Sequence, residues 1–134
     1  MKEVLFKLGL FTSEASRAPS ERVLKALLEV LYIADIEWLR MHPETPGIYE
    51  AGVRYQREIV PAEVWKTPPY CIEDGYLDCE DAACWRAAEL VVRRGIDARP
   101  AFTFKKIGNL SLYHIVVKLP DGTIEDPSKK LGMR

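Results

Sequence analysis

Three side chains that together support nucleophilic catalysis occur in order along the second half of the chain, at Cys79, His114 and Asp126. In such a set a thiolate attacks an amide carbonyl, an imidazole protonates the leaving amine, and a carboxylate fixes the imidazole tautomer. The attack gives a thioester, which water or an incoming amine then resolves. The order of these residues predicts acyl-transfer chemistry, provided that the fold brings them together.

Cys79 is expected in the first turn of a helix. Asp78 is a natural N-cap, and Asp81 follows three positions later as a near capping box. The unpaired N–H groups at a helix start lower the pKa of a thiol, whereas the neighbouring carboxylates of Asp78, Glu80 and Asp81 raise it. We therefore expect a thiolate only where a protonated His114 contacts the sulfur.

Three strands are expected after this helix, which should end at Gly95. Alternating apolar residues predict strands over 96–104 and 110–119, joined by a turn near 108–109. A third strand is expected over 123–126. These elements would form a small antiparallel sheet on which the cysteine helix packs.

The loop before the last strand decides whether His114 and Asp126 can meet. Residues 120–122 read Pro-Asp-Gly, which suits a three-residue hairpin loop with glycine in the left-handed position. That length pairs Leu119 with Thr123, and it places His114 and Asp126 on one face, with Cα atoms roughly 7 to 8 Å apart. A two-residue loop would put them on opposite faces.

The first half is expected to contain one long helix, over 20–40, followed by irregular chain. The apolar residues of its predicted buried face are Val23, Ala26, Leu27, Val30, Leu31, Ala34 and Trp38. Prolines in 42–47 end this helix, and Pro61 suits the first turn of a short helix over 62–65, which the prolines of 67–70 should break. The apolar segment 3–11 is assigned to neither helix nor strand.

Length and composition predict one domain, because 134 residues is a common domain size. It would have an N-terminal helical part at about 1–60 and a core at about 61–134. A net charge of -1 gives no basic field for nucleic acid, and no apolar stretch approaches the ~20 residues that cross a bilayer. Without a recognisable signal peptide, a cytoplasmic location is expected.

Structural explanations compete with the catalytic one for each residue alone. Cys79 could be a buried core thiol, His114 a strand histidine bonded to backbone, and Asp126 a turn residue before Pro127. Their shared order favours the catalytic interpretation. A zinc site is considered and rejected because its residues lack the spacing of known clusters, so no metal or cofactor is expected; that set is Cys71, Cys79, Cys84 and His114.

The same residues resemble the transglutaminase-like superfamily of papain-type cysteine enzymes. The motifs that carry the resemblance are Asp78-Cys79-Glu80-Asp81-Ala82-Ala83, Gly95-Ile96-Asp97-Ala98-Arg99, Tyr113-His114 and Asp126-Pro127-Ser128. The resemblance implies an α+β papain-like core with Cys79 as nucleophile, His114 as base and Asp126 as the orienting acid. One departure is Leu77, where the superfamily commonly has glycine.

A narrower similarity is to small transglutaminase-like proteins of tailed bacteriophages, in the segments 52–55, 79–86 and 125–133. We therefore expect a thiol hydrolase that acts on an amide or isopeptide bond of a protein or peptide, with phage virion proteins among the candidate partners, in the host cytoplasm or the virion. The alternatives are a phage structural or assembly protein that uses the fold for binding, and an acyl-transferring transglutaminase. The oxyanion would be held by the Cys79 N–H and a second donor, with Tyr76 and Trp65 as candidates.

Overall fold

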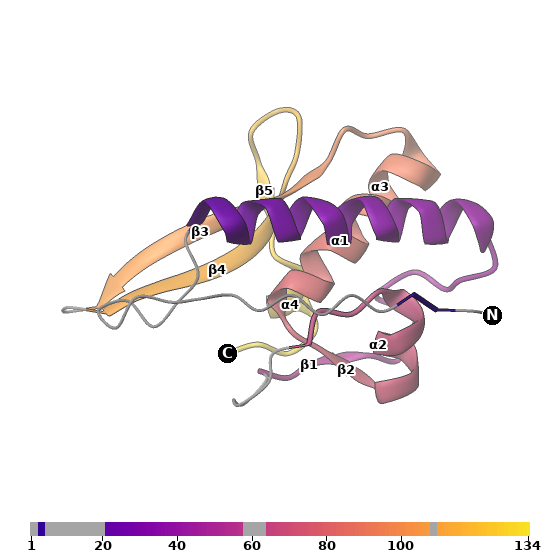
Figure 1. The fold of residues 1–134 in the computed structure, drawn as a ribbon, viewed down its shortest axis with the longest axis horizontal. Coiled ribbons are helices and arrows are strands. Elements are labelled where there is room, and N and C mark those ends of the chain that lie inside the picture. The colour runs from indigo at the N-terminus through magenta and orange to yellow at the C-terminus, as the bar shows by residue number, and fades with distance from the viewer. Residues whose placement is uncertain (1–2, 5–20, 58–63, 108–109) are drawn as a thin grey trace.

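The computed structural model describes residues 3–4, 21–57, 64–107 and 110–134, and gives only the backbone of 104–107 and 110–112 (Figure 1). The described chain has a mixed α+β fold. Its elements are α1 (Glu21–Met41), β1 (Arg54–Tyr55), α2 (Pro68–Asp74), β2 (Tyr76–Leu77), α3 (Cys79–Arg94), β3 (Arg99–Ile107), β4 (Leu110–Lys118), β5 (Ile124–Glu125) and α4 (Pro127–Lys130). None of the helices in these ranges is long and apolar enough to span a membrane.

Helix α3 is the centre of the fold and has the bounds that the sequence predicts. Asp78 caps it in a complete capping box with Asp81, and Gly95 ends it in the left-handed conformation at φ 64°. From Cys79 to Leu90 every residue except Arg86 is buried. The reason is that α3 is covered by α1 on one side and by the antiparallel sheet on another.

The sheet has the order β3-β4-β5, with both pairs antiparallel. Its inner face meets α3, because Ile115 and Val117 of β4 pack in one cluster with Ala83 and Ala87 of α3. The predicted strands are confirmed, although β3 begins later than expected, at Arg99, and β5 is shorter. The predicted turn at 108–109 lies outside the described residues.

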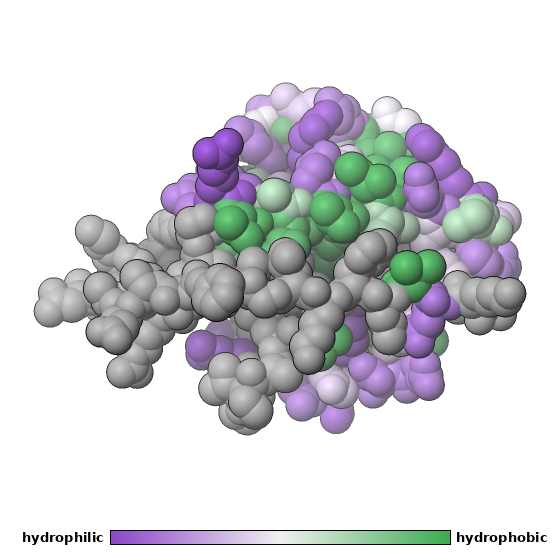
Figure 2. Space-filling view, viewed as in Figure 1, coloured by the Kyte–Doolittle hydropathy of each residue, from purple (hydrophilic) through white to green (hydrophobic). Residues whose placement is uncertain are grey.

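Helix α1 forms over the predicted range, but of its predicted buried face only Leu31 is buried, and Val30 and Ala26 are exposed. The residues that pack inward are Leu24, Leu28, Leu31, Tyr32, Asp35 and Leu39. Val30 is 64% exposed, and Ile33 and Met41 are exposed as well, so that apolar surface lies along the outside of α1 (Figure 2). Two apolar stripes share this helix, and the one that packs inward includes the buried acid Asp35.

The prolines of 67–70 begin a helix instead of breaking one. Pro68 occupies the first turn of α2, where the missing N–H and the fixed φ cost nothing. Val64 and Trp65 are not helical, so the short helix predicted over 62–65 is wrong where it is described; residues 62 and 63 and Pro61, like most of the segment 3–11, lie outside the described residues.

Two short parallel strands, which the sequence pattern did not predict, join the C-terminus to the start of α3. Arg54 pairs with Tyr76, and Tyr55 pairs with Leu77. The N–H of Tyr55 also donates to the carbonyl of Leu131 at 2.9 Å. Tyr55 is thereby held next to the cluster that contains Cys79.

Candidate functional site

The β4–β5 hairpin brings His114 and Asp126 together, as the three-residue loop predicts. Leu119 N–H donates to the carbonyl of Thr123 at 2.9 Å, which closes the loop at 120–122. One imidazole nitrogen of His114, Nε2, then lies 2.8 Å from Oδ2 of Asp126. The two side chains are 26% and 17% exposed, so solvent reaches the pair only in part.

Asp126 is held in place by a second contact. It is the N-cap of α4, and its other oxygen, Oδ1, accepts the Lys129 N–H at 3.3 Å, with Pro127 in the first helical turn. A carboxylate fixed in this way favours the tautomer of His114 that carries its proton on Nε2. The remaining nitrogen, Nδ1, is then the one with a lone pair that can accept a proton.

Cys79 is the first residue of α3, and its sulfur lies at the edge of β4. Amide groups alternate between the two edges of a strand, so the N–H of Ile115 points to the same edge as that of Leu119, which bonds Thr123. Strand β5 pairs only with 117–118. Beyond that pairing, the Ile115 N–H is turned toward the Cys79 sulfur, where it lowers the pKa of the thiol.

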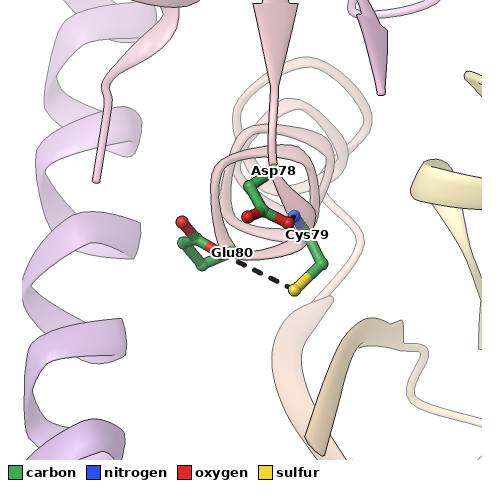
Figure 3. Close-up of side chains that lie close together, drawn as sticks. All are labelled: Asp78, Cys79 and Glu80. Carbon is green, nitrogen blue, oxygen red and sulfur yellow. Dashed lines mark hydrogen bonds between the residues drawn. The ribbon is translucent and has the colours of Figure 1, made fainter. Parts of the chain in front are cut away.

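The sulfur therefore lies beside the peptide that joins His114 to Ile115, but its proton is directed elsewhere. Sγ of Cys79 donates to Oε2 of Glu80 at 3.6 Å, a contact that Figure 3 shows at the start of the helix. Among the hydrogen bonds of the described residues, none joins Sγ to the imidazole. The structure brings the cysteine to the strand of the histidine without a thiol–imidazole bond. Ile115 faces α3, so the side chain of His114, the residue before it, points to the other face of the sheet.

The electrostatics of this turn favour a neutral thiol. Burial raises the pKa of Cys79, and the charges of Glu80 and Asp78 raise it further, while the Ile115 N–H lowers it. Cys79 is only 8% exposed. Burial and carboxylates thus outweigh the helix start, and the resting cysteine carries its proton at neutral pH.

The backbone donors at the start of α3 are already used. The Cys79 N–H, which the sequence suggests for the oxyanion, donates to Oδ1 of Asp78 at 2.7 Å. Asp81 accepts from the N–H of Asp78 at 3.1 Å and from that of Lys66 at 2.7 Å. An oxyanion at this position would need Asp78 to release the Cys79 N–H.

The two candidates for a second oxyanion donor lie in different places. Trp65 packs against the core cluster that contains Cys79. The ring of Tyr76 lies under the ammonium group of Lys66, 3.9 Å from its centroid, and the Tyr76 carbonyl accepts from the same group. Trp65 therefore stays a candidate, and the ring of Tyr76 is engaged by a cation.

Three groups near the sulfur were not identified as site groups from the sequence. They are the Glu80 carboxylate, the Ile115 N–H and Tyr55, whose pKa is raised to about 12 by burial and by the charges of Asp78, Cys79 and Glu80, against a lowering by Arg57. Glu80 directly follows the cysteine in the sequence, but no sequence pattern predicts that its side chain points inward. Tyr55 and the Ile115 N–H are placed near the sulfur by how the strands assemble, and no local sequence pattern specifies that assembly.

The zinc set considered from the sequence is not brought together within the described ranges. Cys71 donates to the carbonyl of Lys66 at 3.7 Å, and Cys84 donates to that of Leu28 at 3.6 Å. All three cysteines are free and buried. Among the described residues, Asp78, Cys79 and Glu80 bring together side-chain atoms that could hold a metal ion. Because the Asp78 carboxylate caps the helix, we assign no metal to this group.

Comparisons of the chain with models of protein families, with curated proteins and with solved structures find no match. The likeness to the transglutaminase-like superfamily and to phage proteins therefore stays a prediction, and the function has to be argued from the side chains at the start of α3 and on the β4–β5 hairpin.

Proposed function

We propose that the protein is a thiol hydrolase that cleaves an amide or isopeptide bond of a protein or peptide, with Cys79 as nucleophile. The observation that carries the proposal is the meeting of the α3 start and β4. The N–H that follows His114 is close enough to the Cys79 sulfur to lower the pKa of the thiol, and the ring of that histidine is held by Asp126 at 2.8 Å. These are the groups that acyl transfer through a thioester requires.

The proposed reaction moves one proton at each step. The S–H proton of Cys79 passes to Nδ1 of His114 as the sulfur attacks the carbonyl carbon. The C–N bond then breaks, and the imidazolium gives its proton to the leaving amine, which leaves a thioester on Cys79. His114 next takes a proton from water, whose oxygen attacks the thioester, and the thiol and a carboxylic acid are released. Asp126 holds the ring and stabilises the imidazolium.

A papain-like core of the transglutaminase type is part of this proposal. It is supported by the chain order of a cysteine at a helix start, a histidine on the second strand after it and an aspartate after the next hairpin. Origin in a phage, with virion proteins as substrates, rests on the sequence resemblance alone.

Thiol labelling tests the proposal, with Cys71 and Cys84 as internal controls. Iodoacetamide should alkylate Cys79 of the folded protein fastest, because the other two side chains are fully buried. His114→Ala should remove the excess reactivity of Cys79 at neutral pH, because it removes the proton acceptor. Peptide mass spectrometry would give the three rates, and a Cys79 rate that is the same without His114 would refute the mechanism.

A second candidate function is a protein-binding module of a phage particle, with the three residues vestigial. It is favoured by the neutral thiol, whose S–H bonds Glu80, and by the Cys79 N–H, which bonds Asp78. Equal and slow labelling of all three cysteines would support this candidate.

Hydrolysis and transfer differ only in the second step. A transglutaminase requires that a primary amine outcompete water for the thioester. Incorporation of a fluorescent amine into a glutamine-containing protein would show transfer, whereas hydrolysis without incorporation would exclude it.

A further inference from the structure

Glu80 is buried in an unusual place for a carboxylate. Only 1% of it is exposed, and it directly follows the candidate nucleophile Cys79. Glutamate is rarely buried to this degree unless it is paired. The residue is therefore held by contacts, and the Cys79 thiol provides one of them.

The Cys79–Glu80 contact also runs against ordinary helix geometry. Neighbouring residues on a helix point about 100° apart and do not face each other. Here the Cys79 sulfur still lies 3.6 Å from Oε2 of Glu80, and the two side chains converge at the start of the helix (Figure 3). The thiol thus has a specific acceptor that is not the imidazole.

We propose that Glu80 is a positioning residue that accepts the Cys79 S–H hydrogen bond and keeps the proton on sulfur in the resting protein. Its meaning for catalysis rests on the proposed function, since the proton would then leave for His114 only as attack begins. A neutral resting thiol also reacts more slowly than a free thiolate would with oxidants and with electrophiles such as iodoacetamide, because the thiolate is the reactive form.

Groups from other elements face the same sulfur and must be weighed with Glu80. Asp78, at the end of β2, adds a second negative charge, and Tyr55 of β1 lies within the field of Asp78, Cys79 and Glu80, with Arg57 nearby. From β4 the Ile115 N–H favours the thiolate. The imidazole of His114 is bonded to Asp126 on the same hairpin. Of the charged groups, Glu80 is the one in hydrogen-bond contact with the sulfur.

Glu80→Gln isolates the charge, because glutamine keeps the size of the side chain and an acceptor oxygen. The iodoacetamide alkylation rate of Cys79 would be measured against pH by peptide mass spectrometry. We expect the midpoint of the profile to fall by about one pH unit or more, and the rate at pH 7 to rise about tenfold. A midpoint that stays or rises would overturn the proposal.

Two further variants serve as controls for this experiment. Glu37→Gln removes an exposed charge from the outer side of α1 and should leave the profile unchanged. Glu80→Asp keeps the charge and should keep a midpoint closer to that of the unchanged protein than Glu80→Gln does. A midpoint as low in Glu80→Asp as in Glu80→Gln would show that shape, not charge, controls the thiol.

The failure of this inference can be separated from failure of the proposed function. The Glu80→Gln shift should persist in a His114→Ala background, because the carboxylate acts on the sulfur directly. Should the Glu80 variants fail to fold, the unchanged protein still decides: free-thiolate reactivity that levels off near neutral pH would show that the proton is not kept on sulfur.

Discussion

Glu125 and Asp126 are neighbours at the end of the β4–β5 hairpin, but their carboxylates bond different kinds of partner. Glu125 accepts from Nε of Arg86 at 2.6 Å and from the hydroxyl of Tyr49 at 2.7 Å. Burial would raise the pKa of Glu125, but these bonds outweigh it and lower that pKa. Asp126 instead bonds the imidazole of His114.

The bond from Arg86 to Glu125 attaches the hairpin to α3, whereas the bond between Asp126 and His114 belongs to a pair that can move a proton. A guanidinium keeps its charge at every pH that a protein survives, and it favours the ionised form of Glu125, so neither member of the Arg86–Glu125 pair changes its protonation near neutral pH. An imidazole can both accept and donate a proton, so the His114–Asp126 pair can exchange a proton with a partner. Since Glu125 lies opposite Val117, whose side chain faces α3, the alternation of one strand gives each role its own face.

The largest expected effect is on chemistry, from a matched pair of amide substitutions. Asp126→Asn should slow the acylation of Cys79 by an activated nitrophenyl ester on the order of 10³-fold, because the ring loses its tautomer and its orientation. Glu125→Gln should leave the acylation rate of the folded protein nearly unchanged. Equal losses in both variants would mean that the two carboxylates do not have separate roles.

The next largest effect is on stability, when the Arg86 guanidinium that holds Glu125 is removed. Arg86 is 14% exposed and also bonds Glu89 at 3.2 Å, so Arg86→Met removes the cation that these two carboxylates share. Glu125 would keep its bond from the Tyr49 hydroxyl, and Glu89 its bond from the Ile48 N–H. We expect a loss of about 3–5 kcal/mol in urea unfolding at neutral pH. The loss should shrink in acid, where both carboxylates are protonated.

An exposed ion pair on α1 provides the control for that experiment. Lys25 lies 2.8 Å from Glu21, and both side chains are more than half exposed. Lys25→Met should cost only about 0.3–0.5 kcal/mol. If Lys25→Met and Arg86→Met lowered the free energy of unfolding by similar amounts, the Arg86 pair would not be the buried anchor described above.

Local chemistry explains what the sequence could predict. The capping box at Asp78 and Asp81, the glycine at 95 and the loop 120–122 each act on neighbouring residues. Their geometry follows without knowledge of tertiary partners. The contact of His114 with Asp126 was predictable for the same reason, because one loop length determines the register between two strands.

The features that the sequence did not predict depend on tertiary contacts. Helix α1 has two apolar stripes, and the one chosen contains Leu28, 4% exposed, in preference to Val30, 64% exposed. Nothing within the helix predicts that Asp35 belongs inside. The inward turn of Glu80 and the approach of Cys79 to the N–H of Ile115 depend likewise on where β5 ends, which is a property of the assembled sheet.

Asp35 extends the comparison to an acid that lacks the partners of Glu125. It is fully buried, and neither carboxyl oxygen has a hydrogen-bond partner among the residues that the structure describes. Burial raises its pKa well above the usual value, and the charge of Asp81 adds to this. The folded state therefore binds this proton more tightly than the unfolded state does.

The sign of the resulting pH dependence follows from that raised pKa. Asp35 favours folding fully below the ordinary aspartate range, and this stability is lost as pH rises from that range toward the raised pKa. The loss should reach at most about 1.4 kcal/mol per pH unit. Urea unfolding should show this slope in the unchanged protein and in Glu37→Gln, but not in Asp35→Asn; an identical slope in Asp35→Asn would assign it to other groups.

The smallest expected effect, apart from that of the Lys25→Met control, comes from the loop that places both carboxylates. Gly122 has φ 88°, and a Cβ added there would meet nothing within 4 Å, so Gly122→Ala would cost conformational energy alone. We expect a loss of about 1 kcal/mol in unfolding free energy, and a smaller one for Gly122→Asn, because asparagine tolerates positive φ better. The His114-dependent labelling of Cys79 should not change, because the strand pairs hold the register. Its loss in a folded Gly122→Ala protein would indicate a slipped hairpin and would undo the assignment of Glu125 and Asp126 to opposite faces.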